Sequence, residues 1–387
     1  MAELDGGGDD GIVAGLVELM RKAIAAGFDG ETIHVAAVGV GVCGLVDDSG
    51  SLQHPLPRGI PGGRGVIEIV GAALGVPVAV DNDANMAALG ELRYGAGRGF
   101  RDFVLITLGT NIGMGLVTGR RILHGARGGA GEGGLMLVPA RSAAPPEDES
   151  GCRLVDAARF GAHPSEAPEG YAFIEELVGG GALARALSEL RGAEGAGPEV
   201  PLRVLAEAAA ADRDALSVVD RAIEGWAYII ANSVALFDPE AIILSGGLAE
   251  EIGPFLEPLR RRAVELSRAA PLILRAELGG DGGLIGASTA ALALLHAPTG
   301  GEPTISSARE PEGKASVTTT APPSPPAKAG SEPDVMGREI GHTVEAVRQT
   351  FAELQRDVSR RLQDFLRGRD LILLRTGASL AMARSAE

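Results

Sequence analysis

The stretch from Val78 to Gly115 most constrains this chain, because it holds two strand-like apolar runs that each end in a polar or glycine-rich turn. The first run, 78–80, is followed by Asp-Asn-Asp at 81–83 and then by an Ala/Leu-rich segment with helical character. The second, 103–108, is followed by a glycine-rich loop at 109–115. Phosphoryl transfer needs a base and backbone N–H groups that hold phosphate. The stretch therefore indicates a phosphoryl-transfer site.

The polar corner at Asp81, Asn82 and Asp83 has two interpretations. Asp and Asn are favoured at helix N-caps, and a plain N-cap would explain them without any chemistry. A side chain at this corner also points to the edge of the sheet at which α/β proteins bind ligands. There a carboxylate at a helix N-terminus stays ionised and can accept a proton from a substrate hydroxyl.

Three glycine-rich segments are further candidates for ligand contact. The loop 109–115 is either an ordinary hairpin turn or a run of N–H groups for phosphate oxygens. Glu132, within G-A-G-E-G-G, is either a surface carboxylate or a bidentate acceptor for two sugar hydroxyls. The Ser-Gly-Gly turn at 245–247 is either a simple strand-to-helix turn or a place where a nucleotide approaches the backbone closely, which only glycine permits.

Composition excludes several classes of function. The chain has 387 residues, 45% of them hydrophobic, which is enough for two lobes; 57 glycines and only 3% aromatic residues favour close packing through small residues. A net charge of −16 argues against nucleic acid as the partner. The chain has only two cysteines and no C-x-x-C pair, which argues against a disulfide framework. Its histidines are not spaced as metal ligands, which argues against a metal site. No signal peptide or membrane span is visible, so we expect a soluble, cytoplasmic protein.

The composition changes at Pro298. Residues 298–333 are rich in Pro, Ser, Thr, Glu and Ala, which predicts a disordered linker. From Ile340 to Val358 apolar residues alternate spacings of four and three, so 334–387 is predicted to be an amphipathic helix or a coiled coil. From Pro298 onward 12 basic residues balance 12 acidic ones, which places the whole net charge on the first 297 residues. We therefore expect a separate C-terminal module, which either docks as an amphipathic helix on the chain's own globular domain or binds a partner helix or a second copy of the chain as a coiled coil.

Five motifs in order resemble the ROK family of bacterial sugar kinases and sugar-responsive repressors, which belongs to the actin-like, hexokinase-type superfamily. Between about Ile12 and Leu295 they read V-G-V-G-V-C-G-L-V-D, V-D-N-D-A-N-M-A-A-L-G-E, L-G-T-N-I-G-M-G, H-G-A-R-G-G-A-G-E and F-D-P-E-A-I-I-L-S-G-G-L. The resemblance implies a two-lobed α/β fold with ribonuclease H-like sheets. Residues 1–84 would form a truncated N-terminal lobe, and 85–297 a larger lobe whose final helix returns to the first.

The resemblance also implies roles for individual residues. Asp83 matches the catalytic base that takes the proton from the sugar hydroxyl. Asn82, Glu132 and Gly44 match sugar-binding positions. The cofactors would be ATP and Mg²⁺, with the metal bridging the phosphates. Six positions match the nucleotide site: Gly109, Thr110, Gly113 and Gly115 in the second phosphate loop, and Gly246 and Gly247 in the adenosine motif.

The chain departs from the family pattern in three places. The D-x-G-G-T phosphate loop on an N-terminal hairpin is absent, so the first strands of the N-terminal sheet should be missing and an uncovered edge should remain; either the true start lies upstream or the chain is a remnant. The family's Gly-His is Gly134-Leu135 and Cys152 stands without its partners, so no zinc is expected. The family's Pro-Gly is Cys43-Gly44.

We therefore expect an ATP-dependent hexose kinase of glucokinase type. The alternative is a catalytically silent sugar-sensing or scaffold protein whose C-terminal heptads recruit a partner. A DNA-binding repressor is disfavoured because no basic helix-turn-helix precedes the kinase-like region.

Overall fold

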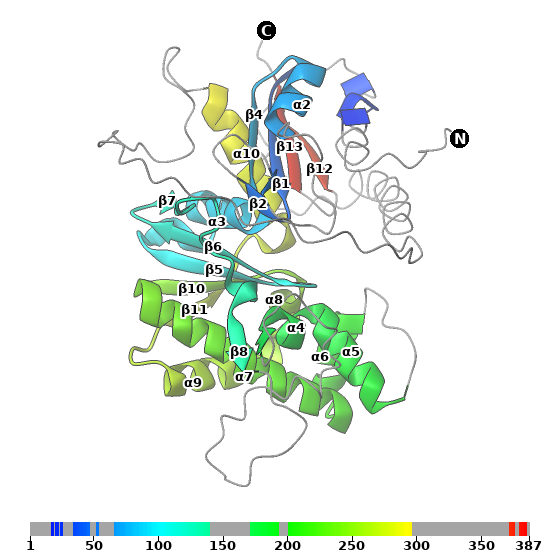
Figure 1. Cartoon of the computed structure of the whole chain (residues 1–387), viewed down its shortest axis with the longest axis vertical. Coiled ribbons are helices and arrows are strands. Elements are labelled where there is room, and N and C mark those ends of the chain that lie inside the picture. Colours follow the sequence, from blue (N-terminus) through cyan, green and yellow to red (C-terminus); the bar gives the residue numbers. More distant parts are fainter. Residues whose placement is uncertain are drawn as a thin grey trace, which may run out of the picture.

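The computed structural model describes residues 17–25 (without 19 and 23), 34–46, 52–53, 66–139, 171–192, 200–295, 371–375 and 379–384. The predicted linker at 298–333 and the heptad segment from Ile340 to Val358 lie outside these residues, as does Cys152. The described residues form two main sheets with helices between and below them (Figure 1). The division into lobes near residue 84 stays a prediction.

The first sheet, called the N-lobe sheet here, has the strand order β12-β13-β1-β4. Strand β1 (Val35–Val42) is buried over most of its length and pairs in parallel with β4 (Val78–Asn82). Because parallel strands end at the same edge, the residues that follow β1 lie beside the polar corner that follows β4. The short strands β2 (Leu45–Val46) and β3 (Leu52–Gln53) form a small hairpin after β1.

Helix α2 (Val66–Leu74) covers part of this sheet. Its buried Val66 and Val70 join the valines of β1 and β4 in one apolar cluster. Met20, in the described part of a helix near residues 17–25, is fully buried in the same cluster. This helical stretch agrees with the apolar spacing in the sequence between Ile12 and Ala26.

The outer half of the N-lobe sheet comes from the other end of the chain. Strands β12 (Leu371–Arg375) and β13 (Ser379–Arg384) form an antiparallel hairpin, and β13 pairs antiparallel with β1, so that Leu380 lies opposite Val40. Two predictions are wrong at this point: the edge of β1 is not uncovered, and residues 371–384 are neither helical nor separate from the first 297 residues. The unpaired N–H and C=O groups of an edge strand can be satisfied by any extended segment that reaches them.

The second sheet, called the C-lobe sheet, has the order β11-β10-β5-β6-β7. Its strands are β5 (Phe103–Leu108), β6 (Ile112–Thr118), β7 (Arg121–Ile122), β10 (Ala241–Ser245) and β11 (Leu272–Arg275). The apolar runs 116–118 and 121–123 on either side of Gly119 predict a hairpin in the sequence, and the structure confirms it, with Val117 opposite Ile122. Strands β5, β10 and β11 run parallel, so the turns after β5 and β10 share one edge.

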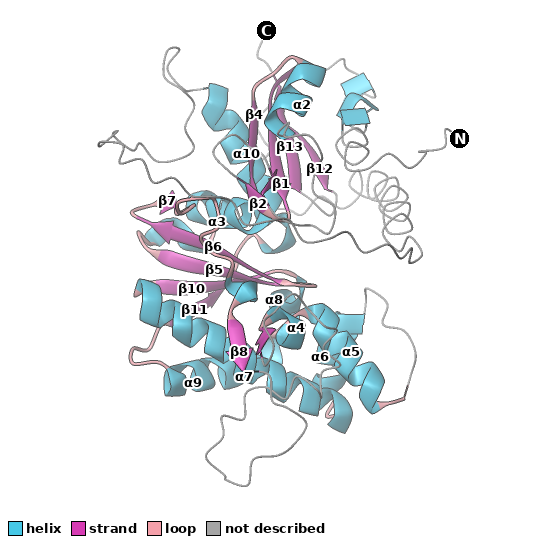
Figure 2. Cartoon of the chain, in the orientation of Figure 1, coloured by secondary structure: helices cyan, strands magenta, loops and turns pink. Residues whose placement is uncertain are grey.

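Helices below the C-lobe sheet form the largest apolar core (Figure 2). They are α4 (Glu175–Val178), α5 (Gly180–Leu190), α6 (Val200–Ala209), α7 (Arg213–Phe237), α8 (Gly247–Glu251) and α9 (Leu256–Leu266). The fully buried ring of Trp226 on α7 donates from its Nε1 to the carbonyl of Val178, 2.9 Å away. The paired strands β8 (Leu137–Pro139) and β9 (Tyr171–Phe173) lead into α4. None of the described helices is both long and apolar enough to cross a membrane.

Two helices with many small residues lie between the sheets: α3 (Asp83–Tyr94) packs on β6, and α10 (Gly282–Leu295) packs on α3 and β1. Gly286 of α10 lies so close to the carbonyl of Met86 on α3 that any side chain would overlap it. Gly39 of β1 meets the carbonyl of Ala287 in the same way. The predicted close packing through small residues is confirmed here, and it fixes α3 between the lobes.

A buried carboxylate ties the end of α3 to the segment before α10. The Glu91 side chain is fully buried and accepts hydrogen bonds from the backbone N–H groups of Ala96 (2.7 Å), Leu278 (2.8 Å) and Glu277 (3.2 Å). We expect Glu91→Ala to lower the free energy of unfolding by about 3 kcal/mol or more, since each buried donor without a partner costs roughly 1–3 kcal/mol. Urea denaturation measures the loss, with the exposed Glu189→Ala as control; equal stability of the two variants would contradict the assignment.

Candidate active site

The corner between β4 and α3 carries the three polar residues that the sequence singled out. Asp81 is 6% exposed, and its Oδ1 accepts from the backbone N–H of Asn82 (2.7 Å) and from Nδ2 of Asn85 (2.8 Å). Its Oδ2 lies 2.7 Å from Nε2 of His124. Asp81 is therefore a structural anchor with both oxygens bonded.

Asn82 is the N-cap of α3. Its Oδ1 accepts from the backbone N–H groups of Ala84 (2.8 Å) and Asn85 (3.3 Å), which is the cap interpretation of the polar corner. Its Nδ2 donates to the carbonyl of Gly44, 3.1 Å away. Gly44 has a φ of +123°, a conformation that favours glycine. The two predicted sugar-binding positions are thus bonded to each other. This bond uses one of the two Nδ2 protons of Asn82.

Asp83 begins α3 and is partly buried. Its Oδ1 accepts from the N–H of Ala84 at 2.8 Å. Burial raises the pKa of the Asp83 carboxyl, and the hydrogen bond from Ala84 opposes the shift only in part. A raised pKa suits a general base, because it brings the proton affinity of the carboxylate nearer to the working pH.

A second carboxylate, Glu132, lies within electrostatic reach of Asp83. Burial, followed by the charges of Glu175 and Asp83, raises the pKa of Glu132. Cys43 follows β1, and its thiol is affected by the same carboxylates. The side chain is exposed, but desolvation by the surrounding protein, followed by the charges of Asp83, Glu132 and Glu175, raises its pKa to about 11. The structure therefore brings the predicted Asp83 and Glu132 together beside Cys43 and Gly44.

Glu175 is the member of this group that the sequence reasoning missed. It is the first residue of α4, and burial raises the pKa of its carboxyl although the N–H of Ile112 is bonded to it. Its carboxylate lies against Gly134, where an added Cβ would come within 2.6 Å of Oε2. The sequence did contain a signal for Glu175: it stands four residues before the triple glycine at 179–181, at the point where a helix begins.

Three glycine turns meet on the other side of this group. The turn after β5 is 109–111, and the N–H groups of Gly180 and Gly181 donate to the carbonyls of Gly109 (2.8 Å) and Thr110 (3.1 Å). Gly246, with a φ of +89°, lies against the backbone of Leu108, and Gly247 begins α8. The predicted nucleotide residues Gly109, Thr110, Gly246 and Gly247 therefore lie together, and the turn 179–181 joins them.

Gly113 and Gly115 have a different position from the one predicted. Both lie within strand β6 and not in the turn, with Gly113 opposite Thr107 and Gly115 opposite Leu105. A Cβ on Gly115 would come within 2.6 Å of the carbonyl of Ala84, and one on Gly113 within 3.1 Å of the Ala84 side chain. These glycines let the start of α3, with Asp83, approach the strand that follows the phosphate turn.

The turn after β5 leaves room beside Gly109. A Cβ on Gly109 would meet only the carbonyl of Asn111, at 3.7 Å, although the N–H of Gly109 itself already donates to that carbonyl at 3.1 Å. Within the described ranges no group of three or more His, Cys, Asp and Glu side chains is placed to hold a metal ion. The histidine position of the family's zinc site is Leu135, whose side chain is 44% exposed.

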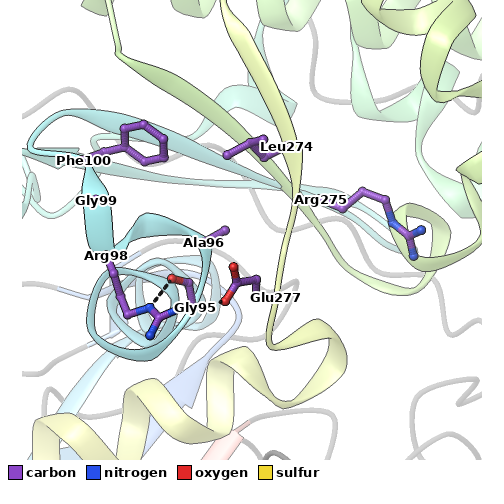
Figure 3. Close-up of a pocket in the computed structure, with 8 residues that line it drawn as sticks. All are labelled: Gly95, Ala96, Arg98, Gly99, Phe100, Leu274, Arg275 and Glu277. Atoms are coloured by element: carbon purple, nitrogen blue, oxygen red, sulfur yellow. Dashed lines mark hydrogen bonds and ion pairs between the residues drawn. The ribbon is translucent and has the colours of Figure 1, made fainter.

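A surface pocket of about 330 Å³ lies elsewhere, between the end of α3 and β11 (Figure 3). Its polar groups are engaged with one another: Nε of Arg98 donates to the carbonyl of Gly95, and Nη2 lies 3.4 Å from Oε2 of Glu277. Arg275 is directed away from them and donates to the carbonyl of Glu250 at 2.6 Å. We assign the candidate site to the carboxylate group, because among the described residues it is this group that combines partly buried, chemically competent side chains with an adjacent glycine turn.

The raised carboxyl pKa values predict a stability cost at neutral pH. When burial raises a carboxyl pKa, the folded chain keeps a proton that the unfolded chain has already released. The stability contributed by such a group is therefore present at low pH. It is lost as the pH rises from 4.5, the ordinary pKa of a glutamate, through the raised pKa of Glu132. We expect Glu132→Gln to raise the free energy of unfolding at neutral pH by roughly 0.5–2 kcal/mol.

Thermal melts at several pH values test this prediction. The gain from Glu132→Gln should shrink as the pH falls toward 4.5, because the wild-type carboxyl is then protonated as well. The exposed Glu251→Gln serves as control and should change little at any pH. A variant that is less stable than wild type at neutral pH would show that Glu132 holds the fold together.

Comparison with known proteins agrees with the fold. The sequence matches the ROK family over residues 14–294. It is 35% identical over 249 residues to the bifunctional enzyme NanE/NanK of Brucella melitensis, covering 64% of this chain and 42% of that enzyme, so it spans less than half the length of that relative. It is 32% identical over 287 residues to a glucokinase of Streptomyces coelicolor, covering 70% of this chain and 85% of the glucokinase.

Solved structures agree as well. A ROK family glucokinase from Streptomyces griseus in complex with glucose and AMPPNP matches with a TM-score of 0.54 and 29% identity, over 72% of this chain and 88% of the glucokinase. The predicted two-lobed α/β fold of the actin/hexokinase type is confirmed by this likeness. With a family match that covers most of its length, the chain belongs to the ROK family.

Proposed function

We propose that this chain is an ATP-dependent sugar kinase that transfers a phosphoryl group to a hydroxyl of a neutral hexose. The observation that carries the proposal is the grouping of Asp83, Glu132 and Glu175 around Cys43, with Glu132 within electrostatic reach of the other two carboxylates. The glucokinase names of the relatives, and the glucose and AMPPNP bound to the Streptomyces griseus glucokinase, support the same substrates.

Each residue has a distinct role in this proposal. Asp83 accepts the proton of the sugar hydroxyl while that oxygen forms its bond to phosphorus and the bond to the leaving ADP breaks. Glu132 and Glu175 accept hydrogen bonds from other hydroxyls and hold the attacking oxygen in line, which is where most of the rate enhancement arises. The backbone at Gly109 and Thr110 would hold the phosphates of ATP, and the turn at Gly246 the adenosine; Mg²⁺ would neutralise the phosphate charge.

The charge of the group selects among sugars. Three carboxylates surround Cys43, and Glu132 lies within electrostatic reach of both others, so the group can accept hydrogen bonds from hydroxyl groups but repels an anionic ligand. A neutral hexose or N-acetylhexosamine therefore fits the sugar side, and a sugar acid or sugar phosphate does not.

A coupled ADP-release assay tests the function. We expect turnover with at least one of glucose, mannose, N-acetylglucosamine and N-acetylmannosamine, and none with glucuronate or glucose 6-phosphate. Circular dichroism should first show that the sample is folded. A folded sample without turnover on any of the four neutral sugars would refute the kinase.

The assay also addresses the alternative of a catalytically silent sugar sensor. That alternative is motivated by the zinc ligands, which are incomplete because Leu135 replaces the family's histidine and Cys152 stands alone. Titration calorimetry distinguishes the two, because a sensor binds sugar without binding ATP and a kinase binds both.

A further inference from the structure

The loop that carries Glu132 begins at His124, directly after strand β7. The carbonyl of His124 accepts from the N–H of Ala130 at 3.0 Å, which closes the glycine-rich loop on itself. Gly131 has a φ of +95° and lies against the carbonyl of Met114 on β6, so the chain is held closely here just before Glu132. The position of Glu132 therefore depends on how the loop is anchored at His124.

The ring of His124 connects this loop to the corner that carries the base. Its Nε2 lies 2.7 Å from Oδ2 of Asp81, and the two side chains are 17% and 8% exposed. The other oxygen of Asp81 is bonded to Asn82 and Asn85, the latter only 2% exposed, so Asp81 is rigid with respect to α3. One contact thus links the loop of Glu132 to the helix that begins with Asp83.

We propose that His124 and Asp81 act as a positioning pair that fixes Glu132 relative to Asp83, and thereby holds the sugar against its base. The proposal deepens the proposed kinase function and rests on it. Neither residue is required to touch the sugar. The effect expected is large for a contact of this kind, because a displacement of about 1 Å of a positioning group can cost roughly 10²-fold in rate.

Kinetics provide the first test. We expect His124→Phe to lower kcat/KM for the sugar by roughly 10²-fold, mainly through a higher sugar KM, with little change in the ATP KM. His124→Gln should recover much of the loss, because its amide N–H can still donate to Asp81. Arg121→Ala, on exposed β7, serves as control. A purely structural role would change both KM values together and would not be rescued by Gln.

The thiol of Cys43 provides a second test that does not require activity. The charge of Glu132 is one of the causes that hold the Cys43 pKa at about 11. In a Cys152→Ser background, His124→Phe should therefore speed labelling of Cys43 by a maleimide severalfold, to about the rate that Glu132→Gln alone produces. Adding Glu132→Gln to His124→Phe should speed it no further, because the same charge has already been displaced.

Asp81→Asn tests the pair from its other side, and should speed the labelling to the same degree. If no sugar is phosphorylated, the kinase proposal fails while the labelling still decides the positioning pair. Wild-type labelling rates in both His124→Phe and Asp81→Asn, or unchanged sugar KM values in an active enzyme, would overturn the proposal.

Discussion

Replacing Asp83 by Asn is expected to lower kcat for sugar phosphorylation by roughly 10²- to 10⁴-fold, the usual effect of losing a positioned general base. The amide cannot take the hydroxyl proton but has the same shape and can still accept from the N–H of Ala84. Sugar and ATP binding should therefore change much less than turnover. Single-turnover kinetics with calorimetric binding constants measure the two effects separately.

A control variant and the melting temperature of Asp83→Asn show whether a loss of turnover comes from the base itself. Asp220→Asn, on an exposed position of α7, should leave turnover unchanged. Because burial raises the Asp83 pKa, its ionised form costs stability at neutral pH, and Asp83→Asn should melt no lower than wild type. A variant that keeps full turnover would assign the base to another group, with Glu132 the first candidate.

Removing residues 366–387 is expected to unfold or aggregate the N-lobe sheet. The deletion takes away β12 and β13 and leaves β1 as an open edge with unpaired N–H and C=O groups along Ala37 to Gly41. Such an edge pairs readily with other chains. We expect faster amide hydrogen exchange in β1, a lower melting temperature and concentration-dependent oligomers.

A matched deletion separates this effect from the loss of chain length. Removing residues 299–320 takes away the same number of residues, all of them from the predicted linker, and should leave β1 protected. A peptide of residues 366–387 added to the truncated chain should restore protection. Ala381→Pro, which removes a donor opposite Gly39, should reproduce part of the loss. Unchanged exchange in β1 after deletion would show that the hairpin is dispensable.

The site residues that could be predicted from the sequence are those that stand in a recognisable local motif. Asp83 and Glu132 were recognised because each stands in a motif whose order along the chain is specific. Gly113 and Gly115 were recognised in the same way, but only the strand register showed that they serve close packing against α3. Glu175 was missed because its place beside Gly134 comes from the folding of a segment more than 40 residues away in the chain.

By itself the sequence determined the two strand ends at Asp81 and Gly109, the glycine turns, the hairpin across Gly119 and the family. These depend on local backbone preferences and on apolar spacing, which neighbouring residues set. Only the tertiary structure decided that the C-terminal strands pair with β1, that Glu175 joins Asp83 and Glu132, and that His124 bonds to Asp81. Each of these three contacts joins residues that are far apart in the chain. Such a contact depends on which backbone groups still lack a hydrogen-bond partner and on which charged side chains lie close together once the chain has folded.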